Sequence, residues 1–438
     1  MNTKTISPKG VLNAVISPPG SKSITNRALV LAALCDDETE LRGVLDSEDT
    51  ELMYDALGEL GLKTQHQSGD CVTRIVGCGG AFPNRKAELY VGNSGTTARF
   101  LSAILAFADG EYRIFGKPRM HQRPIQDLTE ALKSLGANIE YEENAGFPPI
   151  QIRPRKTNCA NSGEPRTTTV AGNVSSQFLT ALLLAAPIAA RNADVEIKMS
   201  GGLVSKPYIE MTLKMMRTFG VEPERTGNFE TFRFPKGIQY QTPVTYFVEP
   251  DASAASYFWG AAAVCGGSVK ISGLSKQSLQ GDIHFVDCLA KMNCDTIWEK
   301  DSITVSRPSD RPLRGITIDM NSMSDTAQTL AVVALFAEGS TRITNIEHVR
   351  YKETDRIADL ATELRRFGAS VEEQHDGLTI TPPSEFALRD TITVQTYDDH
   401  RMAMSFALAG LKLPNIQIAN PDCCKKTFPD FFDVWEKL

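Results

Sequence analysis

The sequence repeats one pattern six times. Each copy has a short β-type run, a small polar turn and then an Ala-rich helical run. The turns fall near residues 20, 92, 172, 250, 323 and 398, about 72 to 80 residues apart. After each Ala-rich run a second β-type run and an amphipathic helix follow. Apolar residues fall at helical spacing in these helices, for example Ile209, Leu213, Met216 and Phe219, and again Ile357, Leu360, Leu364 and Phe367. The pattern predicts an α/β fold made of six βαβαββ-type repeats.

The number and length of the repeats favour two domains of three repeats each. A repeat of about 75 residues is long for a solenoid, and 438 residues exceed one typical core. The Ala-rich helices are apolar on every side, so we expect them to be buried. Their first turns carry Ser, Asn, Asp, Lys and Arg, and we expect these ends to meet in a polar cleft between the domains.

The first repeat contains a predicted anion site. Pro18, Pro19 and Gly20 end a strand, and Lys22, Ser23 and Arg27 follow at the start of a helix. The amide groups of a helix N-terminus and nearby cations favour bound anions. A phosphate-binding P-loop is excluded because the required upstream glycine is missing. The alternative for these residues is a solvated helix start.

Composition excludes several classes of protein. A formal net charge of −7 argues against binding nucleic acid through bulk charge. Nine scattered cysteines with no C-x-x-C pair predict reduced thiols, a cytoplasmic protein and no metal site. The most apolar run, residues 178–190, is too short to cross a membrane. The N-terminus lacks the apolar segment of a signal peptide.

Nine motifs, in order along the chain, resemble the 5-enolpyruvylshikimate-3-phosphate synthase family. They are PPGSKSITNRALVLAAL, VGNSGTTARFL, RPIQDL, GNVSSQFLTALLLAAP, SKPYIEMTL, EPDASAASYF, YKETDRI, DDHRMAM and KTFPDFF. The resemblance implies a two-domain enolpyruvyl transferase fold with the active site in the interdomain cleft. The domains would comprise residues 1–20 with 251–438, and residues 21–250.

The resemblance implies transfer of the enolpyruvyl group of phosphoenolpyruvate to the 5-hydroxyl of shikimate 3-phosphate. Phosphate would leave through a tetrahedral intermediate, with no metal or organic cofactor. It implies a monomer with no nucleic-acid or membrane partner, inhibited by glyphosate. The two substrates carry roughly five to six negative charges, which requires fixed Arg and Lys side chains.

The resemblance also assigns residues to each substrate. For phosphoenolpyruvate these are Lys22, Asn93, Gly95, Arg123, Gln177, Arg356, Arg401 and Lys426. For shikimate 3-phosphate they are Lys22, Ser23, Arg27, Ser175, Ser176, Gln177, Ser205, Tyr208, Asp325, His348 and Lys352. Lys22, Asp325 and Glu353 would be catalytic, since carboxylates suit the two proton transfers and a lysine can stabilise charge.

Several assignments keep alternatives. The pair Ser175 and Ser176 could simply cap a helix, and Glu353 could pair with Arg356 three residues later. His400 is either a ligand contact or a packed histidine. His348 stands where many members of the family have Asn, and Phe100 where familiar members have Pro. Because Gly95 is retained, we expect glyphosate to bind.

Two rival functions remain at the level of sequence. A sister enolpyruvyl transferase acts on UDP-N-acetylglucosamine and usually has a reactive Cys shortly before the Arg of RPIQDL. Here that segment is GKPRMHQ, without Cys. A non-catalytic anion-binding protein on the same fold is the other rival, and the presence of both Asp325 and Glu353 argues against it.

Overall fold

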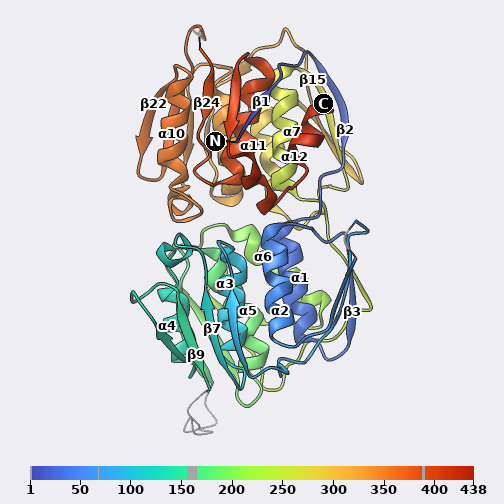
Figure 1. The fold of residues 1–438 in the computed structure, drawn as a ribbon, viewed down its shortest axis with the longest axis vertical. Coiled ribbons are helices and arrows are strands. Elements are labelled where there is room, and N and C mark those ends of the chain that lie inside the picture. The colour runs from blue at the N-terminus through green and yellow to red at the C-terminus, as the bar shows by residue number, and fades with distance from the viewer. Residues whose placement is uncertain (1, 68, 155–164, 387–389) are drawn as a thin grey trace. The chain divides into compact units, whose positions relative to one another are not determined.

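The structure, a computed structural model, describes residues 2–67, 69–154, 165–386 and 390–438. The chain divides into two compact units, which we call unit 1, Met1–Pro19 with Glu249–Leu438, and unit 2, Gly20–Val248. Figure 1 shows the course of the chain through both units. The domain boundaries given above stay a prediction about folding domains.

The repeat is seen clearly in residues 86–153. Strand β6 (Lys86–Tyr90) leads to helix α3 (Gly95–Leu105), β7 (Glu111–Phe115) and helix α4 (Gln126–Ser134). The repeat ends with β8 (Asn138–Tyr141) and β9 (Ile150–Arg153). β6 and β7 are parallel, and β9 pairs antiparallel with both β7 and β8. This is the predicted βαβαββ order.

The other two repeats of unit 2 follow the same plan. One sheet has the order β14-β3-β5-β4 and the other β10-β11-β13-β12. Their strands are β3 (Glu38–Arg42), β4 (Thr64–Gln67), β5 (Val72–Val76), β10 (Arg166–Ala171), β11 (Val195–Ser200), β12 (Glu224–Thr226), β13 (Thr231–Phe234) and β14 (Thr245–Phe247). Their helices are α1 (Lys22–Leu34), α2 (Glu48–Glu59), α5 (Ser176–Ala189) and α6 (Lys206–Thr218).

Unit 1 holds two further four-stranded sheets, with the orders β16-β17-β15-β2 and β19-β21-β23-β22, and a three-stranded sheet with the order β1-β25-β24. Their strands are β1 (Thr3–Ile6), β2 (Leu12–Ile16), β15 (Gly267–Ser272), β16 (Asp295–Trp298), β17 (Ser302–Arg307), β19 (Thr317–Asp319), β21 (Thr341–Thr344), β22 (Ser370–Gln374), β23 (Gly377–Thr381), β24 (Ile392–Val394) and β25 (Ile416–Ala419). A separate short pair joins β18 (Leu313–Arg314) to β20 (Ala337–Glu338).

The helices of unit 1 include six α-helices and several short 3-10 helices. The α-helices are α7 (Ala252–Cys265), α8 (Phe285–Lys291), α9 (Ala327–Ala334), α10 (Arg356–Arg366), α11 (His400–Lys412) and α12 (Phe431–Glu436). The 3-10 helices are η2 (Gly281–His284), η3 (Asn321–Thr326), η4 (Glu347–Tyr351) and η5 (Pro421–Lys426), and unit 2 has η1 (Met120–Gln122).

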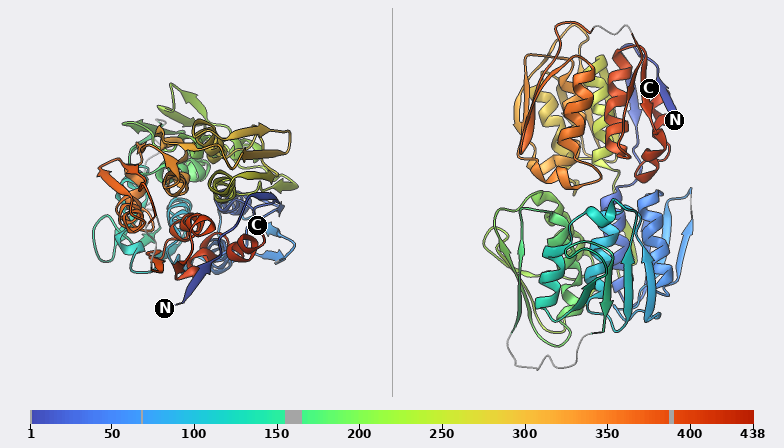
Figure 2. Two further views of the ribbon diagram at one scale, coloured as in Figure 1. Left: turned by 90° about the horizontal axis from the view of Figure 1, so that it is seen from above. Right: turned by 60° about the vertical axis from the view of Figure 1, so that its left-hand side comes forward.

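In each unit the Ala-rich helices lie inside and the sheets lie around them (Figures 1 and 2). Helix α3 is buried along its whole length, and so is α7. This confirms the prediction that these helices are covered on every side. Because a fully covered helix has no solvent face, the polar residues of its first turn must find protein partners or ligands.

The amphipathic helices match the predicted spacing with one correction. Ile357, Leu360 and Leu364 of α10 are buried as expected. In α6, however, Leu213 is only half-buried, and Met215 fills the core. Ile209, Met216 and Phe219 are buried as predicted, so the predicted face of α6 is wrong only at Leu213.

Candidate functional site

In unit 1, three cations surround Asp325, which lies in the 3-10 helix η3 before α9. Asp325 Oδ1 accepts a hydrogen bond from Lys352 Nζ at 2.5 Å and one from Arg356 Nη1 at 3.3 Å. Its Oδ2 accepts from Arg401 Nη2 at 2.9 Å. The four side chains come from the starts or C-terminal ends of different helices, so the repeat architecture brings them together.

The cluster is buried, and this controls its protonation. Burial opposes ionisation of Asp325, but Arg401, Lys352 and Arg356 outweigh it and hold the pKa of its carboxyl well below the usual value. Burial also lowers the pKa of Lys352, against the attraction of Asp325. Asp325 is thus an ionised carboxylate at neutral pH, able to accept a proton.

Arg356 contacts two further carboxylates besides Asp325. Its Nη2 lies 2.9 Å from Glu353 Oε2, and its Nε lies 2.7 Å from Asp399 Oδ2. The predicted Glu353–Arg356 ion pair is therefore present. Burial would lower the pKa of Arg356, but Asp399, Glu353 and Asp325 raise it. The guanidinium stays charged and is held by three anionic groups.

Three other residues of unit 1 considered in the sequence analysis are buried. His348 Nε2 is 2.8 Å from Ser324 Oγ, next to Asp325 in sequence. Burial, followed by the charges of Lys352 and Arg356, lowers the pKa of His348 to about 3, so the ring is neutral. Lys426 is buried in η5, and His400 is buried as the first residue of α11.

In unit 2, Arg27 lies inside the protein rather than at a solvated helix start. Its Nε donates to Thr212 Oγ1 at 2.8 Å and its Nη1 to the Ser23 carbonyl at 2.8 Å. The rings of Phe100 and Tyr208 lie 5.4 Å and 5.8 Å from the guanidinium carbon. Burial lowers the pKa of Arg27 to about 10, and the group is still charged at neutral pH.

Gly95 begins α3 beside Arg123 and Gln177. A Cβ atom on Gly95 would lie 2.5 Å from Arg123 Nη2 and 3.0 Å from Gln177 Oε1. Arg123 is itself oriented by Asn93, to whose carbonyl its Nη1 donates at 2.8 Å. The structure therefore brings four predicted residues together, and a side chain at position 95 would displace the ends of the Arg123 and Gln177 side chains.

The remaining predicted residues of unit 2 lie at helix starts. Lys22 Nζ is 3.3 Å from Asp49 Oδ2. Ser175 caps α5, with its hydroxyl accepting from the Gln177 amide at 3.2 Å, which is the capping alternative named above. Ser205 precedes α6 with φ of 52°, a left-handed conformation that is rare for residues with a side chain. Such strain often marks functional positions.

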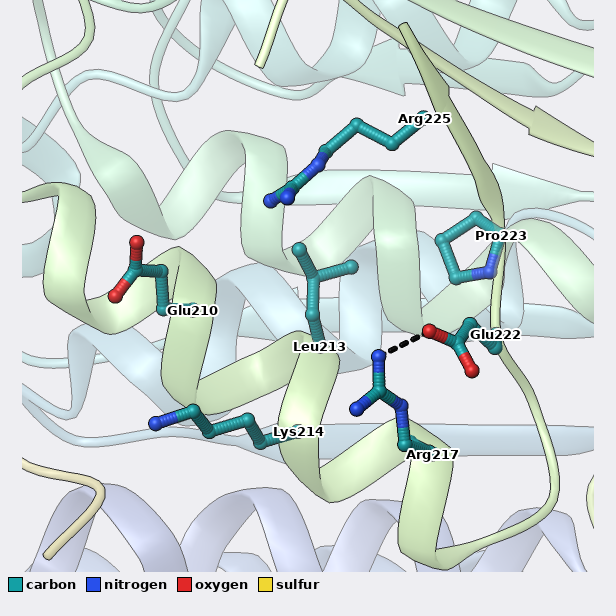
Figure 3. A pocket seen from close by; sticks show the side chains of 7 residues that line it. All are labelled: Glu210, Leu213, Lys214, Arg217, Glu222, Pro223 and Arg225. Atoms are coloured by element: carbon teal, nitrogen blue, oxygen red, sulfur yellow. Dashed lines mark hydrogen bonds and ion pairs between the residues drawn. The ribbon is translucent and has the colours of Figure 1, made fainter. Parts of the chain in front are cut away.

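A surface pocket on the outer side of α6 contains none of the predicted residues. Glu210, Leu213, Lys214, Arg217, Glu222, Pro223 and Arg225 line it (Figure 3). Arg217 and Glu222 pair with each other across it. Within the described ranges, no group of three or more His, Cys, Asp and Glu side chains could hold a metal ion. No helix in the described part of the chain is long and apolar enough to span a membrane.

Comparison with known proteins identifies the family. Residues 6–435 match the family model described as EPSP synthase (3-phosphoshikimate 1-carboxyvinyltransferase). The chain belongs to the EPSP synthase family. A 3-phosphoshikimate 1-carboxyvinyltransferase of Laribacter hongkongensis is 46% identical over 433 residues, which cover 99% of this chain and 98% of the relative. One of Cupriavidus necator is 47% identical and covers 99% of both chains.

Solved structures support the EPSP synthase fold. An EPSP synthase from Acinetobacter baumannii aligns with a TM-score of 0.77 at 24% identity, covering 99% of this chain and 98% of that one. The enolpyruvyl transferase NikO from Streptomyces tendae aligns with a TM-score of 0.77 at 17% identity, covering 100% and 97%. The predicted family, fold and reaction are confirmed, and the sister activity on UDP-N-acetylglucosamine is not favoured.

Sequence reasoning missed several buried partners in this EPSP synthase family member. Asp399 pairs with Arg356, Asp49 with Lys22, and Thr212 with Arg27. Asp399 stands in the quoted motif DDHRMAM, where an acidic residue before a cationic helix start was a usable signal. Thr212 stands in the quoted motif SKPYIEMTL, but its contact with Arg27 depends on the packing of α1 against α6, which the motif does not encode.

Proposed function

We propose that this member of the EPSP synthase family joins phosphoenolpyruvate to the 5-hydroxyl of shikimate 3-phosphate by means of the residues assigned above. The observation that carries the proposal is the buried contact of Lys352, Arg356 and Arg401 with Asp325. Three cations on one ionised carboxylate supply both the charge that anionic substrates require and a proton acceptor.

Phosphoenolpyruvate is bound by cations and by close backbone approach. In unit 1 its ligands are Arg356, Arg401 and Lys426, and in unit 2 they include Lys22 and Arg123. Gly95 supplies the room beside Arg123 and Gln177, since a Cβ would intrude there. Guanidinium groups suit this role because they bind carboxylate and phosphate oxygens in pairs. Asn93 and Gln177 complete this set.

Shikimate 3-phosphate is bound mainly by residues of unit 2. Ser23 and Arg27 bind the ring and its carboxylate, and Ser175, Ser176 and Ser205 bind the phosphate. Tyr208 and Gln177 support them. From unit 1, Asp325 and Lys352 bind the ring hydroxyls, with His348 as a neutral neighbour. Arg27 is suited to its part because its partners fix the guanidinium before any substrate arrives.

The proton transfers fall to two carboxylates. Asp325 takes the proton of the attacking hydroxyl, and Glu353 protonates the methylene carbon of the enolpyruvyl group. The cations make Asp325 a weak base. Substrate anions that bind Arg356 and Arg401 offset the positive charges beside Asp325. The pKa of the Asp325 carboxyl therefore rises as the complex forms. Lys22 stabilises the developing charge on phosphoenolpyruvate. The tetrahedral intermediate then expels phosphate with the reverse proton movements, in which the methyl carbon loses a proton as its neighbouring carbon releases phosphate and the double bond forms again.

We further propose that the protein is a cytoplasmic monomer and that its two units are the two folding domains. Light scattering coupled to gel filtration tests the oligomeric state. A mass near 47.9 kDa supports the proposal, and a mass twice as large contradicts it.

Direct titration tests the substrate assignment. Shikimate 3-phosphate should bind the wild-type protein in calorimetry, whereas UDP-N-acetylglucosamine should give no signal. Arg27→Met should weaken binding about tenfold or more, because a charge-assisted contact is lost. Binding of the sugar nucleotide instead, or unchanged binding by Arg27→Met, would contradict the assignment.

A further inference from the structure

A buried carboxyl group that the mechanism above does not use is linked to the cation cluster by hydrogen bonds. Asp282, in η2, is 3% exposed. Its Oδ2 accepts a hydrogen bond from Ser253 Oγ, in the first turn of α7. The same hydroxyl lies 3.4 Å from Arg401 Nη2, which donates to it and also contacts Asp325 Oδ2 at 2.9 Å. Asp282 therefore reaches the cluster through Ser253 and Arg401.

The charges around Asp282 explain its protonation. Burial, followed by repulsion from Asp325 and Asp251, raises the pKa of Asp282 to about 7, while Ser253 and Arg401 oppose the rise. The other titratable residue of η2 is His284, whose side chain is more than half exposed and pairs with Asp287. Arg401 Nη2 thus contacts Asp325 directly and Asp282 through Ser253, and the pKa of Asp282 lies near neutral pH whereas Asp325 is ionised.

We propose that Asp282 is a positioning residue for the transfer reaction: through Ser253 it orients the Arg401 guanidinium, and its charge sets how much of the Arg401 charge is available to an anionic substrate. The proposal rests on the function proposed above for Arg401. Neutral Asp282 leaves the charge of Arg401 to Asp325 and to phosphoenolpyruvate. Ionised Asp282 competes for it through the serine hydroxyl.

Linkage gives the direction of the effect. An anion bound at Arg401 repels a negative charge on Asp282, so binding of phosphoenolpyruvate favours the protonated form of Asp282. The KM for phosphoenolpyruvate should therefore rise as Asp282 ionises, that is, as the pH increases through about 7. Phosphoenolpyruvate also titrates in this region, so the comparison must be made between variants at each pH.

The test is the KM for phosphoenolpyruvate, with kcat, from pH 6 to pH 8.5 in wild type and Asp282→Asn. Asn can still accept from Ser253 but cannot ionise. The ratio of the wild-type KM to the variant KM should rise roughly three- to tenfold across this range. Asp287→Asn, which changes an exposed carboxylate nearby, should follow the wild-type profile. A constant ratio for Asp282→Asn would overturn the proposal.

Two further variants separate this inference from the site on which it rests. Ser253→Ala breaks the link but keeps both charged groups. It should raise the KM at pH 6, where Asp282 is largely protonated and only the orientation of Arg401 is lost. An unchanged KM at that pH would also overturn the proposal, even if Asp282→Asn did not fold. Arg401→Lys should raise the KM strongly if the proposed site is right. An unaffected Arg401→Lys would reject that site, whereas a strong effect with a constant Asp282→Asn ratio would reject only the inference.

Discussion

Arg356 and Asp399 form a buried ion pair with two contacts. Arg356 Nε lies 2.7 Å from Asp399 Oδ2 and Nη2 lies 3.3 Å from Oδ1, with both side chains almost fully covered. Asp399 also caps α11 by accepting from the Arg401 amide at 2.8 Å. The Asp399 carboxylate thus fixes the position of Arg356 and also the start of α11, the helix that carries Arg401.

Asp399→Asn should therefore weaken both stability and substrate binding. Asn keeps the shape and the cap, but the guanidinium loses a buried counter-charge. We expect a loss of about 1–3 kcal/mol in the free energy of unfolding and a rise of about tenfold in the KM for phosphoenolpyruvate. Denaturant unfolding and steady-state kinetics measure these effects. Asp398→Asn, at the exposed neighbour, is the control, and equal behaviour of the two variants would contradict the role given to Asp399.

Gly95→Ala should disturb phosphoenolpyruvate binding selectively. The added Cβ would lie 2.5 Å from Arg123 Nη2, so the arginine must move. We expect the KM for phosphoenolpyruvate to rise about tenfold or more, with little change for shikimate 3-phosphate. Gly58→Ala, at an exposed helical position with open space around it, should leave kinetics alone and stabilise the protein by up to about 1 kcal/mol.

Glyphosate tests the same position in the wild type. Because Gly95 is retained, we expect glyphosate to inhibit the reaction, and Gly95→Ala should weaken this inhibition together with substrate binding. A reaction rate that is unaffected by saturating glyphosate in the wild type would refute this expectation. Phe100 differs from the Pro of familiar members, but its ring packs on Arg27 and is fully buried.

Glu353→Ala should slow turnover far more than it weakens binding. If Glu353 moves a proton in the transition state, its loss should reduce kcat by about 10²- to 10⁴-fold. Calorimetric binding of both ligands should stay largely intact. Glu373→Ala, which removes a partly exposed carboxylate from its ion pair with Arg350, is the matched control. Normal turnover in Glu353→Ala would contradict the catalytic role and leave Glu353 only its ion pair with Arg356.

His348 should make the protein sensitive to acid. Its pKa is lowered from the usual 6.5 to about 3 in the folded state. Between these values the unfolded chain binds more protons, so stability is present above about pH 6.5 and is lost as the pH falls toward 3. His348→Asn should lose less Tm than the wild type between pH 7 and pH 5.

The control for this experiment is His375→Asn, because the His375 side chain is largely exposed. Its Tm should follow that of the wild type. If the Tm of the wild type and that of His348→Asn changed in parallel between pH 7 and pH 5, this would contradict the lowered pKa of His348. Scanning calorimetry in matched buffers measures all three proteins.

The sequence was sufficient to predict the repeats, and its motifs named Lys352, Arg356 and Arg401, which contact Asp325 in the structure. The assignment of these and the other cations to substrates stays a prediction. Periodicity identified the helices because burial imposes it, and it misplaced only the face of α6 around Leu213. Motifs identified Arg356 and Arg401, but Asp399 and Asp282 act through contacts that join distant parts of the chain. Such contacts depend on how the repeats pack against one another, and the spacing of residues within one repeat does not encode that packing.

Release of phosphate from phosphoenolpyruvate by the purified protein, with metals chelated, tests the central claim most directly. Shikimate 3-phosphate is offered in one reaction and UDP-N-acetylglucosamine in the other. The account predicts phosphate release with shikimate 3-phosphate alone. Release with the sugar nucleotide alone, or with neither acceptor, would contradict it.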